Sequence, residues 1–383
     1  MQAEVVIVGG GVMGTSIAFH LAEAGVRDVV LVERDDLGSG STCKAAGGVR
    51  AQFSDEVNIR LGARSLEAFN GFAQRPGQEI DLHRVGYLFL LSRPEDVEAF
   101  ERSVALQNEL GVPSRMITPA EARELSPLIE TDGILAAAFS PDDGHCTPES
   151  VVLGYATAAR RHGARILTHC ELLDVETTSG GDIAAVRTSQ GRIETSTVIC
   201  TAGAWSTAVG EMAGVHLPVS PLRRQIVFTE PMPGLRDLAR PVPMTIDFET
   251  SFYFHGEGQG LMIGMSDPDE QPGFRLDRDD AWMAGLGEAM AVRAPSLLDV
   301  GLTTGWAGLY EVSPDHNALI GEAPGVSRFL YATGFSGHGF LMGPAVGEVV
   351  RDLYLGREPF VDVSPLDARR LEGDRLRPEI NLV

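Results

Sequence analysis

Lysine is nearly absent from this chain of 383 residues: Lys44 is the single lysine, and the other thirty of the 31 basic side chains are arginines. Acidic side chains number 53, and the formal net charge is −22. A chain with this charge repels phosphate backbones and anionic lipid surfaces, so we expect neither nucleic acid nor a membrane surface as partner. Any chemical step that requires a lysine amine has Lys44 as its one candidate.

Cysteine and long apolar runs are also scarce. The four cysteines form no C-x-x-C pair and no Cys/His spacing typical of zinc, so we expect no metal site and reduced thiols in a cytoplasmic protein. No uncharged apolar stretch reaches about eighteen residues, the length that a membrane-spanning helix needs. Strand-like residues begin at the N-terminus at once and leave no room for a signal peptide. These absences predict a soluble, untargeted protein.

A strand–helix–strand pattern opens the chain. Residues 4–8 (EVVIV) are apolar and β-branched, which is typical of a buried parallel strand. An Ala/Leu-rich stretch over 12–24 predicts a helix, and residues 29–32 predict a second apolar strand that leads directly to Glu33. The pattern therefore predicts a complete β-α-β unit.

The turn inside this unit carries Gly9, Gly11 and Gly14. In a dinucleotide-binding turn the first glycine permits the tight bend, the second lets a pyrophosphate approach the backbone, and the third allows close packing of helix on strand. The amide groups at the helix N-terminus then bind the phosphates, and an acid such as Glu33 binds the ribose diol. FAD and NAD both fit this pattern.

The remaining chain alternates further helices with strands. Helical patterns cover 55–72, 94–110, 147–162, 277–292 and 339–355, and strand patterns cover 85–91, 164–168, 172–177, 183–188, 193–200 and 329–332. The stretch up to Asp143 is punctuated by proline and glycine. An alternating aromatic pattern over 219–264 predicts an antiparallel sheet. The charged stretch 367–377 is expected on the surface.

Six segments together resemble one known family. They are GGGVMG, VLVER, GSGSTCKAAGGVR, TAGAW, GWAGLYEVSPDHNALIG and GFSGHGF, in this order between residues 5 and 350. The chain resembles the flavin amine oxidoreductases, which include D-amino acid oxidase, glycine oxidase, sarcosine oxidase and dimethylglycine dehydrogenase. GGVRAQF followed by SDE-N-RL is most similar to the β subunits of sarcosine oxidase and of dye-linked L-proline dehydrogenase complexes.

The resemblance implies an α/β fold in which a GR2-type Rossmann-like FAD-binding domain carries an inserted α+β substrate domain built on an antiparallel sheet. We expect residues 1–84, 145–218 and 301–383 in the FAD-binding domain, and residues 85–144 and 219–300 in the substrate-binding domain. The resemblance also implies the residues that contact FAD: Gly9, Gly11, Val12, Met13, Gly14, Glu33, Arg34, Ser39, Gly40, Ser41, Thr42, Ala46, Gly47, Gly48, Val175, Thr201, Ala202, Gly203, Trp205, Gly308, Gly334, Gly337, His338, Gly339 and Phe340.

Covalent attachment of the flavin is not expected. Monomeric sarcosine oxidases carry the attaching cysteine just before an aromatic residue, where this chain has Gly308-Leu309-Tyr310. Dimethylglycine dehydrogenases carry a histidine after S-T-W, where this chain has Ser41-Thr42-Cys43-Lys44. Cys43 is adjacent to that position and stays open as an attachment site, but we favour non-covalent FAD.

The substrate site resembles the family in part. Arg50, in R-x-x-F, matches the arginine that binds the substrate carboxylate in sarcosine oxidases, and its planar fork suits a carboxylate. Tyr253 is either an active-site tyrosine or a sheet aromatic, and His338 either lies beside the flavin or is structural. Tyr310 stands where glycine and D-amino acid oxidases have an arginine, and Leu341 where monomeric sarcosine oxidases have a lysine. We predict Arg50, Tyr253, Tyr310 and His338 as the catalytic residues.

The implied reaction is FAD-dependent oxidation of the C–N bond of a small amino acid or N-alkyl amino acid by hydride transfer to flavin N5, followed by imine hydrolysis. The alternatives are a 2-hydroxy acid dehydrogenase and a flavin subunit of a hetero-oligomer that passes electrons to partner subunits. The favoured electron acceptor of the enzyme is a quinone, a dye or a protein. Reaction with O2 is favoured by a fixed cation, which monomeric sarcosine oxidases supply as a lysine where this chain has Met262. We therefore expect a dehydrogenase, with Lys44 and His255 as less favoured substitutes for that cation.

Overall fold

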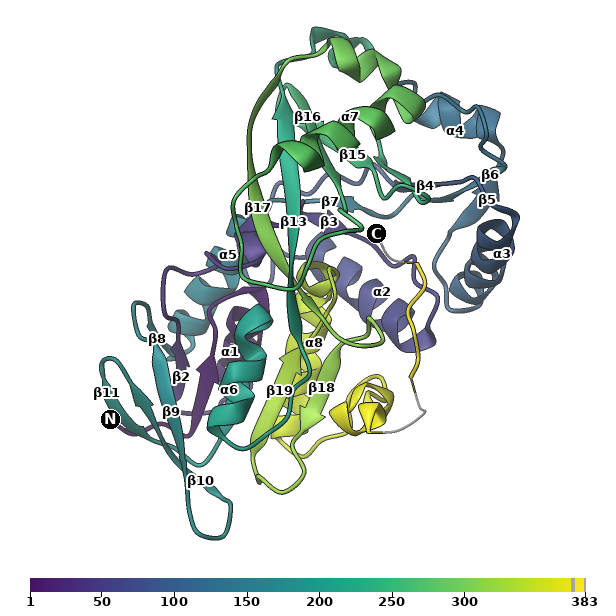
Figure 1. Ribbon diagram of the computed structural model, residues 1–383. Coiled ribbons are helices and arrows are strands. Elements are labelled where there is room, and N and C mark those ends of the chain that lie inside the picture. The colour runs from purple at the N-terminus through teal and green to yellow at the C-terminus, as the bar shows by residue number, and fades with distance from the viewer. Residues whose placement is uncertain (373–375, 382–383) are drawn as a thin grey trace.

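Two large β-sheets organise the computed structural model of the protein, which describes residues 1–372 and 376–381 (Figure 1). The first is a six-stranded sheet in which neighbouring strands run parallel except at the β18 edge. Its strands, in order, are β18 (Leu319–Glu322), β19 (Phe329–Thr333), β12 (Val198–Cys200), β1 (Val5–Val8), β2 (Val29–Val32) and β8 (Arg165–Leu167).

The side chains of β1 alternate between two hydrophobic cores, which explains its uninterrupted apolar sequence. Val5 and Ile7 join the core on one face, and Val6 and Val8 join the core on the other. The first face is covered by the helices α1 (Val12–Glu23), α2 (Glu56–Asn70), α5 (Pro148–Arg161) and α8 (Gly339–Tyr354). The second face is covered by a three-stranded sheet of β9 (Leu172–Thr177), β10 (Ile183–Thr188) and β11 (Gly191–Glu194), and by α6 (Ser206–Met212).

The second large sheet has eight strands. Within the described residues its pairings are antiparallel except between β14 and β4, so the expected antiparallel sheet contains one parallel pair. The strands, in order, are β17 (Leu302–Val312), β13 (Ser220–Thr229), β16 (Gly260–Met265), β15 (Tyr253–Glu257), β14 (Met244–Asp247), β4 (Tyr87–Leu91), β6 (Ala136–Ser140) and β5 (Arg115–Ile117). Its faces are covered by α3 (Pro94–Glu109), α4 (Pro119–Leu125) and α7 (Asp280–Arg293).

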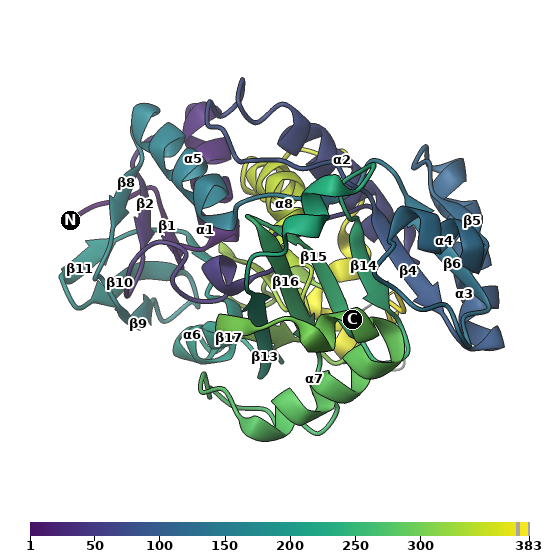
Figure 2. The same ribbon diagram turned by 90° about the horizontal axis from the view of Figure 1, so that it is seen from above.

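The two sheets lie on different sides of the molecule. From above, β1 and β2 are at one side and β4–β6 at the other (Figure 2). A short pair, β3 (Gly48–Val49) with β7 (Gly144–His145), lies between them (Figure 1). The expected α/β sheet and the expected sheet over 219–264 are thus present, while β17, expected with the first group of segments, pairs with β13 in the eight-stranded sheet. The division into a cofactor domain and a substrate domain remains a prediction.

Local patterns predicted most elements well. The strands over 29–32, 172–177 and 183–188 have the expected bounds. The prediction of a single strand over 193–200 is wrong. This stretch contains the end of β11, which pairs with β10, and then β12, which pairs with β1 in the six-stranded sheet. The stretch before Asp143 contains the unexpected β5, α4 and β6.

The charged stretch over 367–377 is only partly a surface segment. Arg370 is 7% exposed and forms an ion pair with Asp315, with Nε and Oδ2 2.7 Å apart. Its guanidinium also donates to the carbonyl oxygens of Leu366 and Asn317, so the charge is compensated in the interior. Residues 373–375 of this stretch lie outside the described part of the chain.

None of the described helices is both long and apolar enough to cross a bilayer.

Candidate cofactor and substrate site

The turn between β1 and α1 requires glycine at two positions. Gly9 has φ +108°, a conformation that residues with a Cβ rarely adopt. A Cβ added to Gly14 would collide with the carbonyl oxygen of Gly9, because the first turn of α1 packs directly on the bend. Both positions therefore have the backbone role that the sequence pattern predicts.

Glu33 is held at the end of β2 by two backbone amides. Its Oε2 accepts from Gly10 N at 2.6 Å, and its Oε1 accepts from Asp35 N at 2.8 Å. These bonds fix the carboxylate beside the turn. Thr42 closes the opposite side, where its hydroxyl accepts from Val12 N, the first amide of α1, at 3.1 Å.

A cleft of about 270 Å³ opens along this turn and continues towards β17 and α8. It is lined by many of the residues expected to contact FAD: Gly9, Gly11, Val12, Met13, Glu33, Arg34, Ser39, Gly40, Ser41, Thr42, Thr201, Ala202, Gly203, Trp205, Gly308, Gly337, Gly339 and Phe340. Segments far apart in the sequence therefore meet around one elongated space.

The other expected cofactor residues do not line this cleft: Gly14, Ala46, Gly47, Gly48, Val175, Gly334 and His338. Val175 lies in β9 opposite Val186 and joins a hydrophobic core, whereas Cys170, Glu171 and Leu172 line the cleft in its place. Gly14 acts through packing at the turn. The loop of Ala46 and Gly47 lies directly after Ala45, which borders the cleft.

Five charged residues outside the expected cofactor-contact set line the cleft, among them Lys44, Arg224 and Glu311. Lys44 places its Nζ 5.8 Å from the centre of the Trp306 ring, and the Arg224 guanidinium lies 4.9 Å from the Tyr310 ring centre. Glu311 accepts from Thr333 Oγ1 at 2.8 Å and from Gly334 N at 3.1 Å. Burial raises the pKa of Glu311 to about 7.

Two of these three had a sequence signal: Glu311 directly follows Tyr310 in the GLYEVSPD segment, and Lys44 lies in the GSGSTCKAAGGVR segment and is one of the candidates for a cation near the flavin. Arg224 had no such signal and enters the cleft through the pairing of β13 with β17.

Arg50 is buried, with 6% of its surface exposed. Its guanidinium donates to the carbonyl oxygen of Asn381 at 2.7 Å and to that of Gln52, and it stacks on Phe53 at 4.1 Å from the ring centre. Desolvation lowers the pKa of Arg50, and nearby Tyr87 opposes this shift. A carboxylate bound here would share the guanidinium with the chain's own carbonyl groups.

Hydroxyl and imidazole side chains lie near Arg50: its charge interacts with Tyr87, Tyr310 and His338, and Tyr253 interacts in turn with Tyr87 and Tyr310. Burial raises the pKa of Tyr87 and of Tyr253 above the ordinary tyrosine range, so both stay protonated and can donate hydrogen bonds. Burial, together with the charge of Arg50, lowers the pKa of His338 to about 3, so this imidazole is neutral. Gly337 packs so closely on the Tyr310 ring that a Cβ would collide with it.

The structure therefore brings the four predicted catalytic residues into one electrostatically connected region. Asp143 also belongs to it: it accepts from Ala51 N at 3.1 Å, and burial raises its pKa to about 7. The sequence pattern did not identify Asp143, because it lies in the punctuated stretch without a motif.

Comparison with known proteins agrees with this arrangement. A family model described as DAO, FAD dependent oxidoreductase, matches residues 4–353. The chain is 31% identical to mitochondrial dimethylglycine dehydrogenase of Rattus norvegicus over 96% of its length. The match covers 45% of that relative, so the chain spans less than half of the relative's length.

Two solved structures have nearly the same extent as this chain. The crystal structure of L-proline dehydrogenase from P. horikoshii superposes with a TM-score of 0.91 at 34% identity, covering 98% of this chain and 99% of that one. Glycine oxidase from Geobacillus kaustophilus gives a TM-score of 0.84 at 25% identity, covering 96% and 98%.

Proposed function

The chain belongs to the DAO family of FAD-dependent oxidoreductases, and on this premise we propose that it oxidises the C–N bond of a small amino acid or N-alkyl amino acid. Its substrate would resemble sarcosine, proline or glycine, in line with the names of its relatives. The observation that carries the substrate class is the buried Arg50, whose charge interacts with Tyr87 and with Tyr310, and Tyr310 lines the cleft.

Three buried polar groups at or beside the cleft support its fit to FAD. The Ser41 hydroxyl, the Arg224 Nε and both ring nitrogens of His338 have no hydrogen-bond partner among the described residues. Buried polar atoms of this kind are rare unless a ligand completes them. Bound FAD supplies the two-electron acceptor for the substrate.

We assign the parts of the cofactor to the chain as follows. Glu33 would hold the ribose, and the α1 N-terminus with Ser39–Thr42 would hold the pyrophosphate. Gly308, and Gly337, Gly339 and Phe340 at the start of α8, would contact the flavin ring. The α8 dipole there would favour negative charge on the ring.

The substrate would be held by its carboxylate. Arg50 would pair with this group, and Tyr87, Tyr253 and Tyr310 would supply hydroxyl donors. The positive charge of Arg50 and the buried setting both disfavour a protonated amine, so the reactive neutral amine is favoured. His338 is neutral and therefore adds no second positive charge to the carboxylate site.

The proposal extends to the electron acceptor, the division into domains and the location of the enzyme. We infer a dehydrogenase that passes electrons to a quinone, a dye or a partner subunit, with the cofactor domain and substrate domain divided as the sequence predicts. A reducing, cytoplasmic location is supported by the four cysteines, which are all unpaired.

An anaerobic reduction screen tests this function. FAD-loaded protein is mixed with N-methyl amino acids, proline, glycine, D-amino acids and 2-hydroxy acids, and loss of the flavin absorbance is recorded. We expect reduction by at least one amine that bears a carboxylate. Reduction by hydroxy acids alone would refute the proposal. Gly14→Val, which should lose FAD because its side chain meets Gly9, is the control for a bound-flavin signal.

A further inference from the structure

A second cavity, of about 120 Å³, lies behind the cofactor cleft. Ala45 borders both spaces, so the two are neighbours at the loop of Ala45 and Ala46. The cavity wall contains three carboxylates, from Asp81, Glu149 and Glu257. Within the described part of the chain its lining residues include neither lysine nor arginine. Such a wall attracts a cation.

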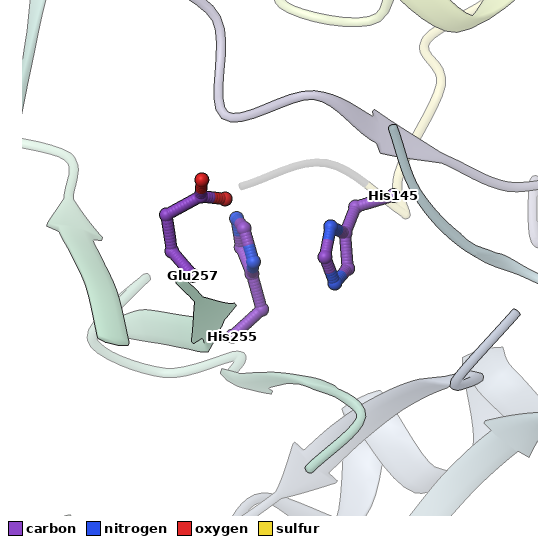
Figure 3. A group of neighbouring side chains, drawn as sticks. All are labelled: His145, His255 and Glu257. Carbon is purple, nitrogen blue, oxygen red and sulfur yellow. The ribbon is translucent and has the colours of Figure 1, made fainter. Parts of the chain in front are cut away.

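Three ligand-type side chains meet at this cavity. His255 and Glu257 are two residues apart on β15, so their side chains leave the same face of the strand. His145 comes from β7, and its ring centre lies 4.2 Å from that of His255. One ligand atom from each residue lies within 4.8 Å of the others, and His255 stands between its two neighbours (Figure 3).

The buried His255 imidazole has a hydrogen-bonding mismatch. Its Nδ1 lies 2.9 Å from the carbonyl oxygen of Gly256, and its Nε2 lies 3.0 Å from the carbonyl oxygen of Ala46. A neutral imidazole carries one N–H, so one nitrogen lone pair must face a carbonyl oxygen. A doubly protonated ring, which would satisfy both contacts, would place a positive charge at a position with 0% exposure, where a charge is costly.

A metal ion removes this mismatch. Two ligands about 2.1 Å from a metal are about 3.4 Å apart at the tetrahedral angle, and His255 Nε2 lies 3.0 Å from the Ala46 oxygen, so a shift of about 0.4 Å lets both atoms bind one ion. Among the described residues no hydrogen bond to the His145 ring would compete with a metal, and Glu257 is exposed, so its side chain is free to rotate towards the two imidazoles. Two imidazoles and a carboxylate form the donor set of open zinc sites.

We propose that His145, His255 and Glu257 bind a divalent transition-metal ion of the zinc class. The Ala46 carbonyl oxygen is a further ligand, and an open coordination position faces the cavity. The ion would tie β7 and β15 to the loop at which the cavity and the cofactor cleft are neighbours. Cysteine and histidine spacing did not predict this site, because its residues meet only through the tertiary fold.

The experiment uses the full chain with FAD bound. The protein is treated with a chelator, desalted and titrated with Zn²⁺ by calorimetry, and Co²⁺ loading is followed by its absorbance beyond the flavin bands. We expect about one tight equivalent per chain. Loss of a direct ligand in Glu257→Gln or His145→Ala should weaken binding at least about tenfold, since even supporting residues contribute that much.

Glu149→Gln is the matched control, because Glu149 lines the same cavity but is not a proposed ligand. It should leave the affinity within about twofold, well below the ligand effect. Equal losses in Glu149→Gln and Glu257→Gln would overturn the proposal and indicate diffuse attraction by a chain of net charge −22. Absence of tight binding to the wild type would also overturn it. If His145→Ala does not fold, the exposed Glu257 variant decides.

Discussion

Arg50 provides the sharpest test of the proposed substrate site. The change is Arg50→Ala, which removes the buried guanidinium that lies among Tyr87, Tyr310 and His338. If this group pairs with a desolvated carboxylate, its loss should weaken substrate capture by about 2 kcal/mol or more. That free energy corresponds to about thirty-fold in kcat/KM.

Arg50 also has a structural role that the assay must separate from binding. Its Nη2 donates to the carbonyl oxygen of Asn381, and so helps to hold the segment 376–381 against the site. Glu379 anchors the same segment, because its carboxylate accepts from Ser54 N at 2.9 Å and from Asn58 Nδ2 at 2.9 Å. Glu379→Gln therefore loosens the segment while Arg50 stays in place.

The measurement is anaerobic flavin reduction in a stopped-flow instrument across substrate concentrations. We expect Arg50→Ala to raise the concentration for half-maximal reduction, and Arg50→Lys to restore part of the loss, because the charge remains but the fork does not. Glu379→Gln should lower thermal stability with little change in substrate capture. Unchanged reduction in both Arg50 variants would refute the role, as would an equal loss of capture in Glu379→Gln.

Three further predictions follow from the cleft and its surroundings. Burial raises the pKa of the Cys43 thiol to about 12, so the reactive thiolate is scarce and acid or heat should release all FAD; yellow colour on the precipitated protein would contradict this. Glu311 has a folded-state pKa of about 7 against an ordinary 4.5, so its stabilising contribution is complete below about pH 4.5 and is lost as the pH rises through 7. The melting temperature of the flavin-free protein should therefore fall more between pH 5 and pH 8 than that of Glu311→Gln, and identical pH slopes would exclude this origin. Met262 offers no charge to superoxide, so reduced flavin mixed with aerated buffer should reoxidise slowly and faster in Met262→Lys; reoxidation of the wild type at the rate of an oxidase would overturn the dehydrogenase assignment.

Local sequence was sufficient for the nucleotide-binding turn. The residues of β1, α1 and β2 are neighbours in the chain, so the strand and helix periods, the glycine spacing and the position of Glu33 are all readable along one short segment. The bend at Gly9 and the close packing at Gly14 follow from backbone geometry that only glycine permits. The six segments that resemble one family then predicted FAD as the cofactor and identified the family.

The tertiary structure decided which distant residues share a site. Arg224 and Glu311 enter the cleft because β13 pairs with β17, and no local period predicts that pairing. His145 and His255 are far apart in the chain but their ring centres lie 4.2 Å apart, and the buried Arg370 pairs with Asp315. Side-chain periods report which face of an element is apolar, but they do not report which element covers that face. Sequence alone therefore determined the cofactor class, and long-range packing determined the charged groups around the cofactor and the cavity behind it.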